Sequence, residues 1–478
     1  TSLKKIEDDL EKLENYQNRE NTPEEKATIP RLELRDVPTT LPKTPREVHE
    51  DKFKFVYHEL ETSGLIYANL YFNIDHLSLE EMQNLQLIGE LLGSIDTENI
   101  SYKDIDDVIW QYLTGLNFTI ASIRINDEKI ENNFKVTFKT TRENIQKAVE
   151  IVKDFLTNTI FDNQKRILEL LRIRKSVFES TMYDSGHLIA INRNNSHIDK
   201  LSYIKEKLSG IDYYLFIKDT IQKASEDFDS LKIELENLYR KILSKDLTLN
   251  ITGDRKDYES LKETILEEFT FLEEAFDKKS LAFHKNPIKE AILSDASVNY
   301  ISKSRDLKDL GLSYKGSLSL ASSIISNPYL YELIRAKGGA YGAGMIIDRA
   351  AIFATYSYRD PNIEKTLESY DMISEIARNL DMDERDFENQ QISTMGKFIR
   401  PKSPSQKADS DFVNYKKENP KDEEEILREI KEAKLSDIIA LADVLDKALA
   451  YNNILVFGAR GKILEKKDFF DKIIDLSD

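Results

Sequence analysis

The strongest constraint on the fold is that the chain presents the same order of elements twice. A strand pattern at Phe134–Phe138 precedes a helix pattern that begins near Asn144, and a strand pattern at Ile352–Tyr356 precedes one that begins near Asn362. The two asparagines are 362 − 144 = 218 residues apart. Because elements that recur in one order indicate a duplicated unit, this match predicts two homologous α+β domains.

Two further matches follow the same order along the chain. Strands that end at Gly253 and Gly458 are each stopped by Gly-x-Arg and followed by a helical pattern, at an offset of 458 − 253 = 205 residues. The third match sets Gly115-Leu-Asn117 against Gly339-Ala-Tyr341, at an offset of 339 − 115 = 224 residues. Each match is short, so the prediction of a duplication depends on their shared order.

A helix and a proline-rich linker precede the repeats. Residues 29–45 contain four prolines, which predicts an extended segment. We therefore assign residues 1–45 to a helix and linker, 46–280 to the first repeat and 281–478 to the second. The chain begins inside the helix without a methionine, which predicts that it belongs to something longer. The apolar positions that indicate the helix are Leu3, Ile6, Leu10 and Leu13.

Composition excludes several classes of function. The net charge of −18 disfavours a nucleic-acid partner, whose phosphates it would repel. No run approaches 18 apolar residues, so no membrane-spanning helix is expected. The absence of cysteine excludes disulfides, thiol catalysis and cysteine-ligated metal, and it is compatible with a reducing cytoplasm.

A glycine-rich segment near residue 340 is the candidate functional site. A short apolar helix ends near Arg335, followed by Gly338, Gly339, Tyr341 and Gly342. Glycine at this density indicates a backbone at positive φ or a backbone brought close to another group. The arginine fork and the phenol could hold an extended peptide. The alternative is a plain turn, with the arginine solvated and the tyrosine in the core.

Other recognised sites are missing from the sequence. Gly342-x-Gly344 would need a third glycine at Ile347 to bind a dinucleotide, and no phosphate-binding loop follows. The Gly311–Lys315 segment does not form a nucleophile elbow. No two histidines are three or four residues apart, so we expect this chain to hold no metal. The histidines are His49, His58, His76, His187, His197 and His284.

The segment from Leu330 to Gly342 resembles the arginine–tyrosine motif of the pitrilysin/insulinase superfamily, in its presequence-protease branch. Ile29–Pro38 is similar to the stretch that follows the hinge in that branch, and Ser63–Asn73 is similar to the first strands of its third domain. The resemblance spans nearly the whole chain. It implies a hinge helix followed by the third and fourth domains, each a mostly antiparallel sheet packed against helices.

The resemblance also implies a function. This chain would be the C-terminal half of a zinc metalloendopeptidase that closes around peptides as a clamshell. Its partner would be the N-terminal half, which holds the zinc in an inverted H-x-x-E-H motif that this sequence lacks. Arg335 and Tyr341 would contact the substrate, on a loop that contains Gly338, Gly339 and Gly342. The chain alone would be inactive, and a bacterial cytoplasm or an organelle would be its compartment. The alternative is a non-catalytic scaffold subunit of the same superfamily.

Overall fold

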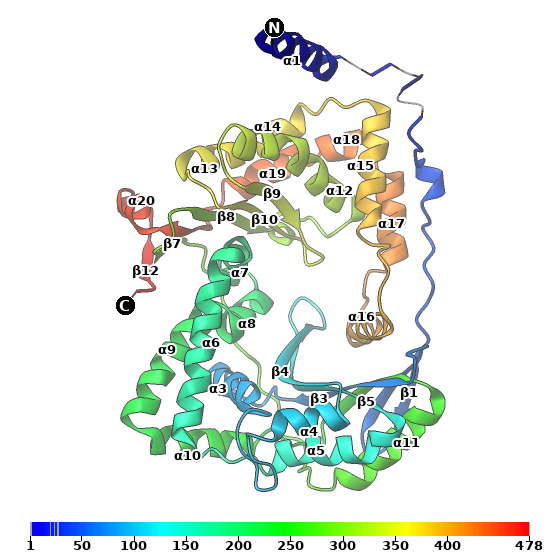
Figure 1. Cartoon of the computed structure of the whole chain (residues 1–478), viewed down its shortest axis with the longest axis vertical. Coiled ribbons are helices and arrows are strands. Elements are labelled where there is room, and N and C mark those ends of the chain that lie inside the picture. The colour runs from blue at the N-terminus through cyan, green and yellow to red at the C-terminus, as the bar shows by residue number, and fades with distance from the viewer. Residues whose placement is uncertain (1, 20, 23, 26–27, 478) are drawn as a thin grey trace.

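The computed structural model describes residues 2–19, 21–22, 24–25 and 28–477. It contains two six-stranded sheets, one above the other in Figure 1, with helices packed around them. Only the β2–β6, β7–β11 and β7–β12 pairs are parallel among the described strands, so both sheets are mostly antiparallel. The predicted α+β class is therefore confirmed.

The first sheet has the strand order β1-β2-β6-β3-β5-β4. Its strands are β1 (Glu47–Glu50), β2 (Lys54–Glu59), β3 (Leu65–Asn73), β4 (Gly115–Arg124), β5 (Ile130–Thr141) and β6 (Leu247–Gly253). The helices of this unit are α3 (Leu79–Leu91), α4 (Ile105–Tyr112), α5 (Ile145–Thr157), α6 (Gln164–Asp184), α7 (Gly186–Ser196), α8 (Lys200–Ser209), α9 (Ile211–Glu226), α10 (Phe228–Tyr239) and α11 (Arg255–Glu268), with the short η2 (Arg142–Asn144) before α5.

The second sheet has the strand order β12-β7-β11-β8-β10-β9. Its strands are β7 (Lys289–Ser294), β8 (Asn299–Asp306), β9 (Gly342–Ile347), β10 (Ile352–Tyr358), β11 (Ile454–Ala459) and β12 (Lys472–Asp475). Its helices are η3 (Leu307–Leu310), α12 (Gly316–Ile324), η4 (Ile325–Ala336), α13 (Glu364–Asp371), α14 (Ile373–Arg378), α15 (Glu384–Gly396), α16 (Pro404–Lys416), α17 (Glu423–Glu432), α18 (Leu435–Ile439), α19 (Ala442–Leu449), α20 (Arg460–Leu464) and η5 (Lys467–Phe469).

The strand order confirms the duplication. The first sheet contains the series β2-β6-β3-β5-β4, and the second repeats it as β7-β11-β8-β10-β9. The third sequence match, however, is wrong by three residues. Thr114 N–H donates to the Lys139 carbonyl at 3.0 Å and Tyr341 N–H donates to the Tyr358 carbonyl at 2.9 Å, each just before a strand that begins with glycine. Tyr341 is therefore equivalent to Thr114, and not to Asn117.

The two units exchange helices. Helix α7 of the first unit lies against β8, β10 and β11 of the second sheet, and α16 of the second unit lies against β6 of the first (Figure 1). The contact made by α16 is apolar, since buried Phe412 packs with Val56 and Tyr71. It is also polar, since the Asp411 carboxylate lies 2.9 Å from His58 Nε2. The two helices begin 404 − 186 = 218 residues apart, so they are the same helix of the repeat.

A buried ion cluster holds α7 in place. The Arg193 guanidinium, 4% exposed, donates to both oxygens of Glu290 on β7, at 2.7 and 2.9 Å. It also donates to Asp212 at 2.6 Å and to Glu206 at 3.1 Å. Burial disfavours ionisation of Glu290, but the hydrogen bonds from Arg193 and His197 outweigh it and hold the pKa of Glu290 below its usual range. The cluster therefore joins the first unit to the second sheet.

The linker runs along the second unit before it reaches the first sheet (Figure 1). It is extended apart from η1 (Leu34–Asp36), and its Val37 is buried with Met395 and Ile430 of α15 and α17. Helix α1 (Ser2–Asn18) lies apart from both sheets, with Ile6, Leu10 and Leu13 about half exposed; the side chain of Leu3 lies outside the described residues.

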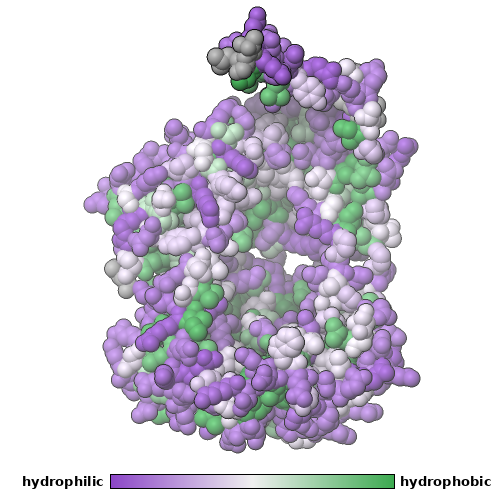
Figure 2. Space-filling view, viewed as in Figure 1, coloured by the Kyte–Doolittle hydropathy of each residue, from purple (hydrophilic) through white to green (hydrophobic). Residues whose placement is uncertain are grey.

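The space between the units is open. Figure 2 shows an opening through the middle of the molecule, between the upper and lower bodies. A cleft of about 640 Å³ lies between the hairpins β4–β5 and β9–β10, so both units contribute to its walls. Among the described helices, none has both the length and the apolar character needed to cross a bilayer.

Candidate functional site

The glycine-rich loop begins where η4 ends. Gly339 N–H donates to the Arg335 carbonyl at 2.9 Å, and Ala340 N–H donates to the Ile334 carbonyl at 3.1 Å, so the last carbonyls of the helix are satisfied. Gly339 has φ of +82°, which favours glycine. At Gly338 an added Cβ would lie 2.5 Å from the Ile334 carbonyl oxygen, so this position has no room for a side chain.

The loop is held from below by the strand-to-helix turn after β10. The Asn362 amide donates to the Gly338 carbonyl at 2.6 Å. Tyr341 N–H then pairs with the Tyr358 carbonyl, which starts the β9–β10 ladder. The backbone on both sides of Gly339 is therefore fixed, and Arg335 and Tyr341 are presented on an ordered frame.

Tyr341 lies at the surface. Its side chain is 64% exposed, and its ring meets Tyr358 edge-on with the centroids 5.7 Å apart. The plain-turn alternative placed this tyrosine in the core, and that expectation is wrong. The phenol is free to contact another molecule.

Arg335 is held between two aromatic rings. Its guanidinium carbon lies 4.9 Å from the ring centroid of Tyr331 and 5.4 Å from that of Tyr341. Such contacts orient the guanidinium without consuming its hydrogen-bond donors. The nearby Glu332 pairs with Lys337 at 3.3 Å, and no described carboxylate pairs with Arg335. The sequence prediction that Arg335 and Tyr341 stand together is thus matched by the geometry, and their role stays a prediction.

Three contributors to this site were not predicted. Tyr331 precedes Arg335 by four residues, a helical spacing that could have indicated it. Tyr358 reaches the site through strand pairing, and His187 of α7 lies 4.9 Å from its ring, between centroids. Burial lowers the pKa of His187. The helix exchange therefore brings a first-unit side chain up to the aromatic base of the second-unit site, and no local pattern signals it.

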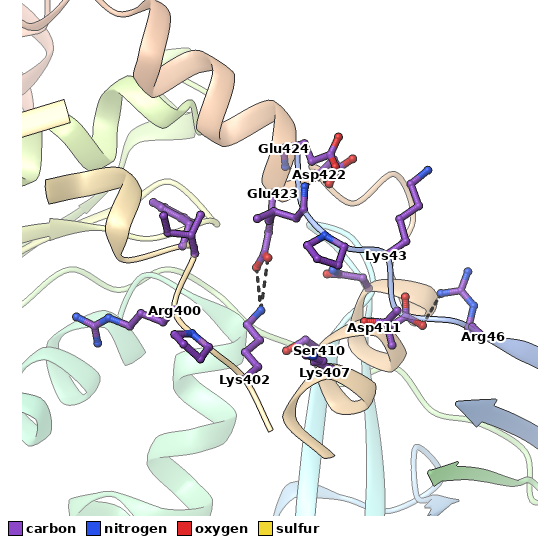
Figure 3. Close-up of a pocket in the computed structure, with 17 residues that line it drawn as sticks. Lys43, Arg46, Arg400, Lys402, Lys407, Ser410, Asp411, Asp422, Glu423 and Glu424 are labelled. Atoms are coloured by element: carbon purple, nitrogen blue, oxygen red, sulfur yellow. Dashed lines mark hydrogen bonds and ion pairs between the residues drawn. The ribbon is translucent and has the colours of Figure 1, made fainter. Parts of the chain in front are cut away.

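A second hollow, of about 650 Å³, lies between the linker, α16 and the start of α17 (Figure 3). Arg46 pairs there with Asp411 at 2.9 Å, and Lys402 pairs with Glu423 at 3.4 Å. Arg400 points away from both pairs. Because the converging charges are already paired, we interpret this hollow as a join between the linker and the second unit.

No metal centre is formed by the part of the chain that the structure describes: three His, Asp or Glu side chains nowhere come together as ligands. The zinc implied by the resemblance would therefore have its ligands in another part of the protein.

Comparison with known proteins defines the class. The family model for the region associated with subfamily C of the M16 peptidases matches residues 1–219, and the model "PreP C-terminal domain" matches residues 289–459. The "Protein HypA" of Clostridium perfringens is 30% identical over 485 residues, which cover 99% of this chain and 49% of that protein. "Presequence protease 1, chloroplastic/mitochondrial" of Arabidopsis thaliana is 26% identical, over 85% of this chain and 38% of that protein.

Solved structures share the fold. A conserved protein from Enterococcus faecalis superposes with a TM-score of 0.63 at 14% identity, covering 85% of this chain and 96% of that one. A peptidase M16 inactive domain from Pseudomonas fluorescens gives 0.56 at 12% identity, covering 87% and 97%.

Together these matches show that the chain belongs to the M16 peptidases. Within them it corresponds to the C-terminal half of a presequence-protease type. It spans about half or less of the length of the curated relatives described above.

Proposed function

We propose that this chain is the substrate-binding half of a zinc metalloendopeptidase that degrades peptides in a closed chamber. Arg335 and Tyr341 would contact the peptide backbone beside the scissile bond. The supporting observation is their geometry: an exposed phenol and a guanidinium without a carboxylate partner among the described residues, both held on a fixed loop. Arrangements of this kind suit binding of carbonyl oxygens by donors that are already in place.

The two side chains have distinct tasks in this proposal. Peptide cleavage builds negative charge on the carbonyl oxygen, so a donor fixed beside it stabilises the transition state more than the ground state. Tyr341 would supply that donor. Arg335 would bind neighbouring carbonyls and hold the peptide extended. A hydrogen bond to a charged group contributes about 1.5–3 kcal/mol, equivalent to about ten- to a hundred-fold in rate.

The remaining parts of the enzyme lie outside this chain. Zinc in the N-terminal half would supply the activated water. Residues 1–45 would act as the hinge between the halves, and residues 46–280 and 281–478 would be the third and fourth domains. Gly338, Gly339 and Gly342 would let the peptide approach the loop closely. We place the enzyme in a bacterial cytoplasm, which the lack of cysteine permits.

The test uses this chain joined to its N-terminal half. Tyr341→Phe should lower kcat/KM about ten- to a hundred-fold, mainly through kcat, with the melting temperature and zinc content unchanged. Arg335→Ala should cost at least as much and also raise KM. Tyr16→Phe, an exposed tyrosine on α1, is the matched control and should leave both constants unchanged. Full activity in Tyr341→Phe would refute the proposal. A preceding half without H-x-x-E-H would favour a scaffold subunit instead.

A further inference from the structure

The first unit has an open groove at the edge of its sheet. β4 is the last strand of that sheet, and a cavity of about 480 Å³ lies between its first half, α3 and α4. We call this cavity the β4 groove; it is lined by Leu116, Asn117 and Thr119 of β4, Glu90 of α3 and Asp106 and Ile109 of α4. An edge strand offers unpaired backbone groups to any extended chain laid beside it.

The equivalent edge of the second unit is closed differently. There Ser326 at the start of η4 accepts from Met345 N–H at 2.9 Å, which binds the helix directly to β9. In the first unit Gln86 of α3 accepts from Ile120 N–H at 3.1 Å and covers the edge further along β4. The beginning of β4 is left facing the groove. This is the end of the strand that corresponds to Tyr341 in the other unit.

The groove is selective in charge and in polarity. Arg174 lies 3.1 Å from Glu90, so that carboxylate is already paired. Asp106, exposed in the first turn of α4, has no cationic partner among the described residues. Ile109 supplies an apolar wall, and the next residue, Trp110, is 87% exposed. An exposed indole beside a free carboxylate suits a ligand that carries both an apolar and a cationic side chain.

We propose that the β4 groove is a second peptide-binding site, which takes an extended segment as an added strand, with a basic side chain at Asp106 and an apolar one against Trp110. The proposal does not depend on the Arg335–Tyr341 site, which lies on the other unit.

The indole itself reports binding, because Trp110 is the only tryptophan of the chain. The 478-residue chain is titrated with a blocked ten-residue peptide of alternating leucine and arginine, and with the same peptide carrying glutamate in place of arginine. We expect a saturable change in Trp110 emission with the arginine peptide and a much weaker one with the glutamate peptide. No saturable change, or equal affinity for the two peptides, would overturn the proposal.

Two neighbouring aspartates provide a matched pair of variants. Asp106→Asn removes the carboxylate that lines the groove, and it should weaken the arginine peptide about two- to fivefold, as expected for a partly exposed ion pair. Asp107→Asn makes the same change one residue along α4, on a side chain that does not line the groove, and it should leave the affinity unchanged. Equal effects of the two would overturn the proposal. Arg335→Ala should not alter the titration; a loss of the signal in that variant would place the peptide at the other site. Circular dichroism checks that each variant is folded.

Discussion

The ion cluster around Arg193 makes a sharp prediction about how the units are joined. Arg193→Met keeps much of the side-chain volume and removes the charge. Glu290, which is fully buried, would then lose both hydrogen bonds from the guanidinium, and Glu206 and Asp212 would lose the same partner. Removing one partner of a buried ion pair costs about 3–5 kcal/mol, because an uncompensated charge stays behind.

Urea unfolding at pH 7 measures this loss. Arg193→Met should lower the free energy of unfolding by about 3–5 kcal/mol. Arg378→Met is the matched control, since Arg378 pairs with Asp443 at 2.9 Å but is half exposed, and its loss should cost less than about 1 kcal/mol. The pKa of Glu290 is below its usual range, so its contribution is present above the unfolded pKa of about 4.3 and is lost as the pH falls. Equal losses in the two variants at pH 7 would refute a locking role for Arg193.

Three further predictions concern the loop, the aromatic base and the linker. Gly338→Ala should destabilise the protein by more than about 1 kcal/mol and reduce activity of the joined enzyme, because its Cβ would meet the Ile334 oxygen; Gly342→Ala meets only ordinary contacts and should leave stability unchanged, as thermal unfolding can check. Burial lowers the pKa of His187 below its unfolded value of about 6.5, so its contribution to stability is present above that pH and is lost below it; the melting temperature of the His187→Gln variant should fall less than that of the unmodified protein between pH 7.5 and 5.5. Val37→Ala should cost about 1.5–3 kcal/mol in urea unfolding, whereas Val48→Ala, 40% exposed, should cost less than about 0.5 kcal/mol.

Local patterns predicted the strands and the duplication well, because alternation and strand–helix order are local properties. They failed where the three-dimensional context decides. Residues 402–407 were interpreted as a loop, yet Ser403 caps α16 and Pro404 is its first residue, a start signal that was present in the sequence.

Packing also divided one predicted helix. The segment Asp422–Leu449 is three helices, since Ile430 packs with Val37, Ile438 packs with Leu320, and Leu445 lies in the core beneath the second sheet. A single straight helix could not reach three separate clusters.

The candidate site was predictable in part. Arg335 and Tyr341 are six residues apart on one turn, so their proximity follows from the local sequence. The partners Tyr358 and His187 arrive through strand pairing and through the helix exchange, and both depend on contacts between residues distant in sequence. The register error in the third match has the same origin. Gly115 could be matched to either Gly339 or Gly342, and only the backbone hydrogen bonds distinguish the two.

The exchange of α7 and α16 gives the chain the architecture of a swapped dimer whose two copies have been joined end to end. Each unit covers its neighbour's sheet with its own copy of one helix, so a unit on its own would have a bare sheet face and a helix with nothing to cover. A fragment containing only residues 46–280 should therefore pair with itself, its α7 taking the place that α16 occupies on the first sheet. Duplication followed by fusion would then have freed one copy to acquire an arginine and a tyrosine while the other kept Thr114 at the matching position.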